Sequence, residues 1–467
     1  MARAKKEAAL TPEERLQAAL VPDWEWPYKL PGNWCWVRLY SLAHIISKGT
    51  TPKGGKDAYV EKGIRFLRIE NINEDGSISH ENIKHITEEM HTGFLRRSIL
   101  CKDDILISIA GTLGKTGIVG EADLPLNTNQ AISFVRLIRG NLLPQYIKMS
   151  IDNPKTQDML ISQTKVTSIP NLTLEIIGNC AIPLAPLAEQ QRIVDRIESL
   201  FSKLDEAKEK AQAVLDSFET RKAAILHKAF TGELTAKWRE EHGVRMESWR
   251  TISFKDVCKK ITDGTHHSPI NTENGEYMYI TAKNIKENGI DLTNITFVSK
   301  DVHEEIYSRC DVQYGDVLYI KDGATTGIAT VNTMDKPFSL LSSVAVLRPD
   351  KKQILAEYMA YNLNSSKTKT MMISSMSGNA ITRLTLSKIK AASITICSLD
   401  EQEEIVRLID DLLGKEQQTK EVAEAVLAQI DLMKKSILAR AFRGELGTND
   451  PNEESAVELL KKVFQKE

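Results

Sequence analysis

The stretch LAEQQRIV (Leu187–Val194) recurs as LDEQEEIV (Leu399–Val406), at an offset of 212 residues (399 minus 187). A second stretch, KAAILHKAFTGEL (Lys222–Leu234), recurs as KKSILARAFRGEL (Lys434–Leu446) at the same offset of 212. No insertion or deletion separates the two copies over this region. Because a repeat at a fixed offset marks a repeated structural unit, the chain is expected to contain one architecture twice.

The duplication continues upstream, where the two copies are more divergent. NLTLEIIGNCAIPL from Asn171 corresponds to RLTLSKIKAASITI from Arg383. DDILISIAG corresponds to YGDVLYIKDG, FLRIENI to YITAKNI, and KGTTP to DGTHHSP. These matches place Asp104 on Asp316 and Asn71 on Asn284. The well-conserved parts of the repeat are therefore its helical segments, and the other parts have drifted.

A heptad pattern predicts one long helix in each copy. Apolar residues recur at alternating spacings of three and four, which is the pattern of a coiled-coil seam. The seam residues are Val194, Ile197, Phe201, Leu204, Leu215, Phe218 and Ile225 in the first helix and Val406, Ile409, Leu413, Leu427, Ile430 and Ile437 in the second. We expect the two helices to bury these seams against each other as an antiparallel coiled coil, with the globular parts at opposite ends.

Lysines occupy four positions of the same seam. They are Lys208 and Lys420, which are equivalent, and Lys222 and Lys434, which are equivalent as well. A polar seam residue can fix the register of two helices. Alternatively, a lysine can lay its aliphatic stem over apolar neighbours and keep its charge in water. The pattern alone leaves both interpretations open.

The segments before each helix have short strand-like apolar runs and short helix candidates. GIRFLRI (Gly63–Ile69), DILISIA (Asp104–Ala110) and AISFVRLI (Ala131–Ile138) are typical of strands. PQYIKMSI and EYMAYNLNSS are helix candidates. The fold class is therefore mixed α/β, with two repeated globular domains of ~150 residues each joined by two long helices in a pseudo-two-fold repeat. The expected boundaries are an N-terminal arm (1–31), the first domain (32–186), helix 187–232, a linker (233–246), the second domain (247–398), helix 399–443 and a C-terminal tail helix (444–467).

Composition narrows the class of protein. The 467 residues carry a net charge of −2, so any DNA-binding surface must be local. Six cysteines lie far apart without a C-x-x-C motif, which indicates neither a zinc site nor a disulfide framework. The N-terminus lacks a signal-peptide core, and no window approaches the ~18 apolar residues of a membrane span. We therefore expect a cytoplasmic protein.

The stretch ILISIAGTLGKTGIVG (Ile105–Gly120) approaches a phosphate-binding loop, G-x-x-x-x-G-K-[ST]. Ile109 stands where the first glycine belongs, and the chain continues as a strand rather than a helix. The second copy, Gly323–Gly327, is shorter and lacks the lysine. A glycine-rich hairpin is therefore predicted, and an NTP-dependent enzyme built on this loop is the weaker alternative.

The repeated helical motifs, from PLAEQQRIV to ILHKAFTGELTAKWR with the second copy ending SILARAFRGEL, resemble those of the specificity subunit of type I restriction–modification systems. The N-terminal stretch EERLQAALVPDWEWPYKLPGNWCWVRL also resembles leaders of that family. The resemblance covers nearly the whole chain, although the globular domains match only in outline.

This resemblance implies a function. Two target-recognition domains would each read one half of a bipartite, asymmetric DNA sequence, and the helices would set the gap between the halves. The expected partners are double-stranded DNA, two modification (methyltransferase) subunits and two restriction (translocase/nuclease) subunits. S-adenosylmethionine and ATP/Mg would be bound by those partners, with no cofactor in this chain. We expect no catalytic residue and no metal ligand in this chain. The modification subunits would dock on the long helices, and the short amphipathic ends of the chain would add to that docking site.

Polar and basic loop residues are the candidates for DNA contacts, because base edges and phosphates need donors, acceptors and cations. In the first domain they are Lys48, Thr50, Lys53, Lys115, Thr116, Asn129, Gln130, Lys165 and Thr167. In the second domain they are Thr265, His266, His267, Lys321, Thr325, Ser342, Ser343, Asn379 and Arg383. Each of them could instead be a solvated turn residue. A coiled-coil scaffold with protein-binding globular domains remains the alternative function.

Overall fold

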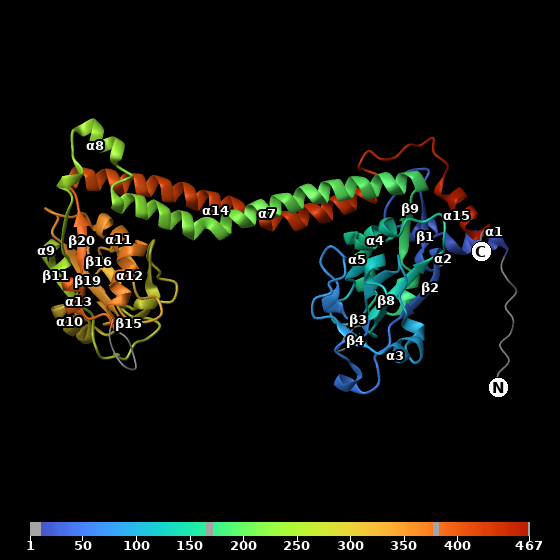
Figure 1. The fold of residues 1–467 in the computed structure, drawn as a ribbon, viewed down its shortest axis with the longest axis horizontal. Coiled ribbons are helices and arrows are strands. Elements are labelled where there is room, and N and C mark those ends of the chain that lie inside the picture. Colours follow the sequence, from blue (N-terminus) through green and yellow to red (C-terminus); the bar gives the residue numbers. More distant parts are fainter. Residues whose placement is uncertain (1–10, 165–170, 377–382, 466–467) are drawn as a thin grey trace. The chain divides into compact units, whose positions relative to one another are not determined.

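The computed structural model describes residues 11–164, 171–376 and 383–465. The chain divides into two compact units, Met1–Lys210 with Val426–Glu467 and Ala211–Ala425. Each unit holds one globular domain together with part of both long helices, α7 (Leu187–Thr231) and α14 (Leu399–Ala441) (Figure 1). Both helices begin at the residue that the repeat predicts. The mixed α/β prediction with two long helices is confirmed.

The first domain is built from two small sheets and a strand pair. The four-stranded sheet has the order β2 (Ala43–Lys48), β8 (Ile132–Leu137), β5 (Ile105–Ser108), β6 (Thr116–Ile118), all antiparallel. The three-stranded sheet has the order β4 (Lys84–Ile86), β3 (Ile64–Leu67), β7 (Leu126–Thr128), and β7 runs parallel to β3. Strand β1 (Cys35–Arg38) pairs with β9 (Ala181–Leu184), directly before α7.

The second domain repeats this topology. Its four-stranded sheet has the order β11 (Cys258–Asp263), β19 (Val344–Pro349), β16 (Val317–Ile320), β17 (Ala329–Val331). Its three-stranded sheet has the order β15 (Thr296–Val298), β12 (Tyr277–Ile280), β18 (Ser339–Leu340), with β18 parallel to β12. Strand β10 (Arg250–Ser253) pairs with β20 (Ser393–Ile396), and a small hairpin joins β13 (Ile285–Lys286) to β14 (Gly289–Ile290).

Short helices alternate with the strands in the same order in both domains. The first domain has α2 (Leu39–Leu42), α3 (Glu88–Thr92), α4 (Pro144–Asp152), α5 (Pro154–Ser162) and α6 (Leu174–Gly178). The second has α9 (Phe254–Val257), α10 (Lys300–Arg309), α11 (Ala356–Asn364), α12 (Ser366–Ser374) and α13 (Leu386–Ala391). After α7 comes α8 (Ala236–His242), and the first and last helices of the described residues are α1 (Pro12–Ala19) and α15 (Ala456–Gln465).

A buried arginine–aspartate pair recurs inside both four-stranded sheets. Arg136 binds both oxygens of buried Asp104 at 2.7 and 2.8 Å, and Arg348 binds Asp316 at 2.9 Å through two nitrogens. Such two-point pairing compensates the cost of burying a carboxylate. The aspartate that the repeat keeps at equivalent positions is therefore a structural residue.

The long helices complete the domain cores. In the first unit, Ile193 and Ile197 of α7 and Leu438 of α14 belong to one buried cluster with Trp36 and Tyr146. In the second unit, Ile405 and Ile409 of α14 and Leu226 of α7 join the corresponding cluster with Tyr358. In each unit the start of one helix packs with the end of the other, so the pairing is antiparallel. Burial of this apolar surface is the main force that fixes the helices to the domains.

The seam residues line the helix pair in both units. The predicted apolar seam positions are buried or half-buried, and of the four seam lysines only Lys208 is exposed. The Lys434 ammonium lies 5.2 Å from the Phe201 ring centroid and bonds Asp205 at 2.5 Å. Lys420 lies 4.9 Å from the Phe218 ring centroid. These two lysines therefore cover aromatic rings, while the Lys434–Asp205 pair also ties one helix to the other.

The helical ends of the chain lie against the first domain. Leu16 and Ala19 of α1 and Leu460 and Phe464 of α15 are buried in the same cluster as Trp36. Their apolar faces are thus used inside the unit, which corrects the expectation that they form a docking surface. Ile193 of α7 is buried in this cluster as well. Within the described residues, no helix is long and apolar enough to cross a membrane.

Candidate nucleic-acid interface

Backbone contacts gather the predicted loops of the first domain at one edge of its sheets. Lys48 ends β2, and the next residue, Gly49, donates its N–H to the Ile132 carbonyl at 2.9 Å. Thr50 donates to the Thr128 carbonyl at 3.1 Å, directly before Asn129 and Gln130. The loop after β2 and the loop after β7 therefore lie together, although about eighty positions separate them in the sequence.

The second domain builds the same edge with the same kind of contacts. Thr265 donates its N–H to the Leu340 carbonyl at 2.8 Å and accepts a bond from the Ser342 N–H at 2.8 Å. Lys321 donates its backbone N–H to the Ser343 carbonyl at 2.9 Å. The predicted residues from three separate segments thus meet at one place in this domain as well.

A glycine allows each of these loops to approach the neighbouring strand. A β-carbon at Gly49 would lie 2.0 Å from the Asn129 carbonyl oxygen, and one at Gly264 would lie 1.9 Å from the Leu340 carbonyl oxygen. No side chain fits at such distances. This explains why glycine recurs in KGTTP and DGTHHSP.

Three of the predicted contacts, Lys165, Thr167 and Asn379, lie outside the described residues. Described neighbours of those segments belong to the same edge. Leu172 donates its N–H to the Ile109 carbonyl at 3.1 Å, and Leu384 donates to the Lys321 carbonyl at 3.4 Å.

Exposure separates the remaining predicted residues into three groups. The exposed ones are Lys48, Lys53, Gln130, His266, His267, Thr325 and Arg383. The half-buried ones are Thr50, Lys115, Asn129, Thr265, Ser342 and Ser343. Thr116 and Lys321 are buried and already bonded, Thr116 to Asp152 and Lys321 to Asp322 at 2.7 Å. Burial therefore argues against direct DNA contacts by Thr116 and Lys321, and the contacts of the other residues stay a prediction.

Of the two adjacent histidines, His266 contacts a carboxylate of its own domain. His266 Nε2 lies 3.3 Å from the Asp263 carboxylate, within a group of basic side chains around that residue. Among the residues that the structure describes, no group of three or more His, Cys, Asp or Glu side chains could hold a metal ion.

The glycine-rich stretch of the first domain is a hairpin. Strands β5 and β6 pair antiparallel with Ile105 opposite Ile118, and Gly111 and Gly114 have φ angles of 73° and 76°. Lys115 and Thr116 lead into β6 and not into a helix, so no helix N-terminus faces them. The hairpin prediction is confirmed.

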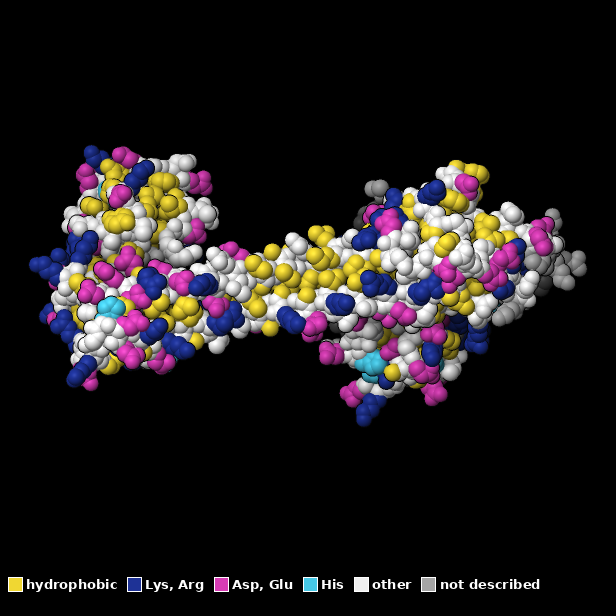
Figure 2. Space-filling view, turned by 90° about the horizontal axis from the view of Figure 1, so that it is seen from above, with side chains coloured by type: hydrophobic (Ala, Val, Ile, Leu, Met, Phe, Trp, Pro, Cys, Tyr) yellow, Lys and Arg dark blue, Asp and Glu magenta, His cyan; other side chains and the backbone are white. Residues whose placement is uncertain are grey.

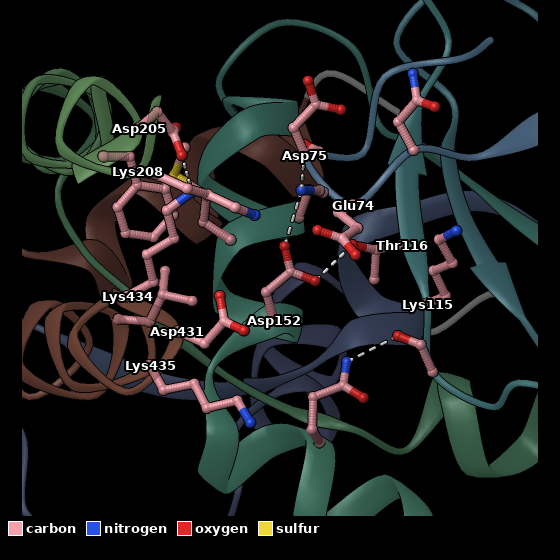
Figure 3. A pocket seen from close by; sticks show the side chains of 17 residues that line it. Glu74, Asp75, Lys115, Thr116, Asp152, Asp205, Lys208, Asp431, Lys434 and Lys435 are labelled. Carbon is pink, nitrogen blue, oxygen red and sulfur yellow. Dashed lines mark hydrogen bonds and ion pairs between the residues drawn. The ribbon is translucent and has the colours of Figure 1, made fainter. Parts of the chain in front are cut away.

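A hollow of about 770 Å³ lies beside this hairpin, between the first domain and the helices of the same unit (Figure 3). Five carboxylates line it, from Glu74, Asp75, Asp152, Asp205 and Asp431. Five lysines line it as well, at positions 115, 148, 208, 434 and 435. Lys148 bonds Asp152 at 2.9 Å, and the Thr116 hydroxyl bonds the same carboxylate. Carboxylates placed beside Lys115 and Thr116 would repel a phosphate, so this hollow is a junction of ion pairs and a poor nucleotide site.

Sequence reasoning missed three exposed residues near the edge of the first domain. Phe94, Arg96 and Arg97 follow α3, and the Lys53 ammonium lies 5.2 Å from the Phe94 ring centroid. The basic pair in GFLRRS was visible in the sequence. Only the folded arrangement shows that this pair lies next to the loop after β2.

The backbone contacts at the sheet edge recur in both domains, and a protein-family model also matches the chain twice. A family model described as type I restriction modification DNA specificity domain matches residues 31–215 and again 246–426. The chain belongs to this family. Its two matches fall on the two copies of the repeat, and both include the edge described above.

Individual relatives support the same assignment to the specificity-subunit family. The EcoKI specificity subunit of Escherichia coli (strain K12) is 23% identical over 93% of this chain and 96% of its own length. The EcoBI specificity subunit of Escherichia coli is 32% identical over 39% of this chain, and the match spans 38% of that subunit. The crystal structure of the HsdS subunit from Thermoanaerobacter tengcongensis superimposes with a TM-score of 0.65 at 20% identity, over 90% of this chain and 99% of that one. This last likeness shows a common fold.

Proposed function

We propose that this chain gives a type I restriction–modification assembly its DNA target. Each globular domain reads one half of a bipartite sequence through the loops at its sheet edge. The first domain uses Lys48, Thr50, Asn129 and Gln130, and the second uses Thr265, His266, His267 and Ser342. The long helices set the gap between the two halves and dock the modification subunits.

The observation that carries this proposal is the duplicated edge. Both domains hold their loops in place with equivalent backbone bonds and an obligatory glycine, while the side chains that reach solvent differ. Asn129 and Gln130 have amide groups that can bond adenine at two points. A shared scaffold with different side chains is what two readers of different half-sites require.

The helices offer a surface for partners. Val422, Leu432 and Met433 of α14 are 63%, 65% and 46% exposed, although they lie on a helix that already buries a seam. Figure 2 shows hydrophobic side chains gathered along the exposed helices. Apolar side chains in such positions commonly mark protein contacts. The modification subunits are the partners that we assign to this surface.

The chemistry belongs to the partners under this proposal. The modification subunits would bind S-adenosylmethionine, and the restriction subunits would use ATP and Mg²⁺ for translocation and cleavage. This chain is then a non-catalytic subunit, and its contribution to the reaction is the choice of sequence.

Methylome sequencing tests the proposal directly. The chain would be expressed with its modification subunit in a host that lacks other methyltransferases. The expected result is a methylated bipartite sequence that disappears when this chain is omitted. Methylation with the same sequence in the absence of this chain would contradict the proposal.

A coiled-coil scaffold with protein-binding globular domains is the second candidate. The exposed apolar side chains of α14 would suit other protein partners as well as modification subunits. The two functions differ in their dependence on salt. DNA binding by the assembled complex should weaken steeply as salt rises, whereas protein binding through apolar contacts should not.

A further inference from the structure

Equivalent positions of the two domains carry opposite charges at the edge described above. Lys48 is the last residue of β2 and Asp263 is the last residue of β11, and each precedes the obligatory glycine. Arg97 and Arg309 are also equivalent, at the offset of 212 residues. The two domains therefore share a basic residue at this repeat position, and in the second domain that residue pairs with Asp263.

In the second domain that carboxylate pairs with basic side chains, of which Arg309 is 52% exposed and Lys321 is buried. Arg309 Nη2 donates to Asp263 Oδ1 at 2.8 Å and to the Gly264 carbonyl at 2.6 Å. The Lys321 ammonium lies 3.5 Å from Asp263 Oδ2. Asp263 is buried, and the positive charges of Arg309 and Lys321 compensate the cost of burying its carboxylate. Arg309 and Lys321 are thus both paired with a carboxylate of their own domain.

Four exposed cations belong to this edge of the first domain. Lys48, Lys53, Arg96 and Arg97 are exposed, and within the part of the chain that the structure describes none of them forms an ion pair with a carboxylate. Lys48 stands where the second domain has Asp263, the partner of Arg309. Four positive charges therefore face solvent in a chain whose net charge is −2.

Helix α3 ends at a glycine shortly before two of these arginines. Helix α3 stops at Gly93, where a β-carbon would lie 2.7 Å from the Glu89 carbonyl oxygen. Glu305 stands at the equivalent position, and α10 continues there to Arg309. As a result Phe94 is 53% exposed, whereas its counterpart Ile306 is 7% exposed.

Contacts tie this turn to the loop after β2. The Lys53 ammonium lies 5.2 Å from the Phe94 ring centroid. Asn127 Nδ2 donates to the Leu95 carbonyl at 3.1 Å, and the adjacent Thr128 carbonyl accepts the Thr50 N–H at 3.1 Å. The cations from both segments therefore belong to one surface around β7.

We propose that Lys48, Lys53, Arg96 and Arg97 form a phosphate-contacting surface of the first domain that has no counterpart in the second. This inference rests on the proposed function, since the phosphates are those of the DNA target. Because free cations release counterions from DNA while internally paired ones do not, the first domain supplies the larger share of salt-dependent affinity.

The test uses the complex with its modification subunits and a short duplex carrying the target found by methylome sequencing. Dissociation constants are measured between about 50 mM and 200 mM salt. The double variant Arg96→Gln/Arg97→Gln should reduce the slope of log K against log[salt] by about 1.8, because each lost phosphate contact contributes about 0.9. The matched control Arg309→Gln should leave the slope unchanged.

A second variant keeps the test decisive if the arginine double variant does not fold. Lys48→Asp should lower the slope by about 0.9 to 1.8, since it removes one cation and can pair with Arg97 as Asp263 pairs with Arg309. Unchanged slopes in both variants, or an equal loss in Arg309→Gln, would overturn the inference while leaving the proposed function intact. A wild-type complex that fails to bind the duplex would instead overturn the proposed function.

Discussion

A β-carbon at Gly49 or Gly264 would overlap a carbonyl oxygen of the adjacent segment, so these glycines decide how closely each loop approaches its sheet. Gly49→Ala should destabilise the chain by about 1–3 kcal/mol, because the loop must move away. Methylation of the DNA target should fall as well. Urea unfolding and methylome sequencing would measure the two effects.

Gly32 provides the control for this prediction, because a β-carbon there meets no atom within 4 Å. Gly32→Ala should change stability by no more than about 0.5 kcal/mol. Equal effects at Gly32 and Gly49 would show that the close approach has no energetic consequence.

Two buried histidines at equivalent positions make stability depend on pH. Burial lowers the pKa of His91 and of His303, whose Nδ1 lies 2.9 Å from the Ser339 hydroxyl. The unfolded chain binds a proton near pH 6.5, whereas the folded chain binds it only at lower pH. The stability that these groups contribute is therefore present above about pH 6.5 and is lost as the pH falls toward their folded pKa values.

Replacing His303 by another aromatic residue tests this pH dependence. His303→Phe preserves the stack on Tyr277, whose ring centroid lies 4.1 Å away, but cannot be protonated. The loss of unfolding free energy between about pH 7.5 and pH 5.5 should be smaller in this variant than in the wild-type chain. An identical loss in both would contradict the assignment.

The repeat shows which polar residues both copies keep, but it does not show whether they bond within the protein or contact DNA. Asp104 and Asn71 are equivalent to Asp316 and Asn284, and all four bond neighbouring atoms inside the protein. The sequence could not separate such internal bonds from DNA contacts, because both use the same polar groups. Thr116 and Lys321 were assigned to DNA for this reason, and the structure shows them buried.

At the scale of elements, the EQ pair at the start of each long helix ties that helix to its own domain. Gln190 accepts the Leu143 N–H at 3.3 Å, and Gln402 accepts the Leu355 N–H at 3.0 Å. Glu189 accepts a bond from the Trp34 indole at 2.7 Å, and Glu401 accepts one from Trp249 at 3.0 Å. The best-preserved stretch of the repeat thus forms the joint between sheet and helix.

The two glutamates differ in what else they hold. Glu401 is buried against Arg239, whose Nη1 donates to its Oε1 at 2.6 Å. Glu189 instead accepts from the neutral Asn449 side chain at 2.9 Å, and burial raises its pKa. Glu401→Gln should therefore cost about 3–5 kcal/mol, because it leaves a buried cation unpaired.

Glu189→Gln is the matched comparison for this joint. This substitution removes a carboxylate that has no buried arginine bonded to it, unlike Glu401. The free energy of unfolding should therefore fall by only about 1–3 kcal/mol. Denaturant unfolding of the full chain, followed by tryptophan fluorescence, measures both values. Equal costs, or a larger cost at Glu189, would show that the Arg239 pair is not the decisive contact.

Helix boundaries were more predictable than loop positions. The heptad pattern is local to each helix, so it specifies α7 and α14 directly. The end of α3 at Gly93, where a β-carbon would meet the Glu89 carbonyl oxygen, has no periodic signal. The basic surface of the first domain could therefore be recognised only from the folded chain.

At the scale of the whole molecule, the duplication predicts independent readers. Replacing residues 32–186 with the matching domain of a relative should change one half of the methylated sequence and leave the other half and the gap unaltered. The converse replacement of residues 247–398 should change only the other half. Methylome sequencing of both chimaeras checks this, and a single replacement that altered both halves would contradict it.

The gap itself should follow the length of the helices. The division between the two units falls after Lys210 in α7 and after Ala425 in α14, so an insertion there leaves both domain cores intact. Seven residues added at each point keep the heptad seam in register and lengthen each helix by ~10 Å. Because one base pair occupies ~3.4 Å, the unread gap should grow by up to ~3 base pairs.

Rotation of the duplex limits the activity of that variant. About three additional base pairs turn the second half-site by about a third of a helical turn, so methylation should weaken even where the longer target is chosen. An insertion of four residues at each point supplies the control, since it shifts the seam and locally unwinds a coiled coil. The heptad variant should therefore keep its fold and select a longer target, while the four-residue variant should lose stability. A heptad variant that methylates the original target with an unchanged gap would refute the idea that these helices measure the distance between the half-sites.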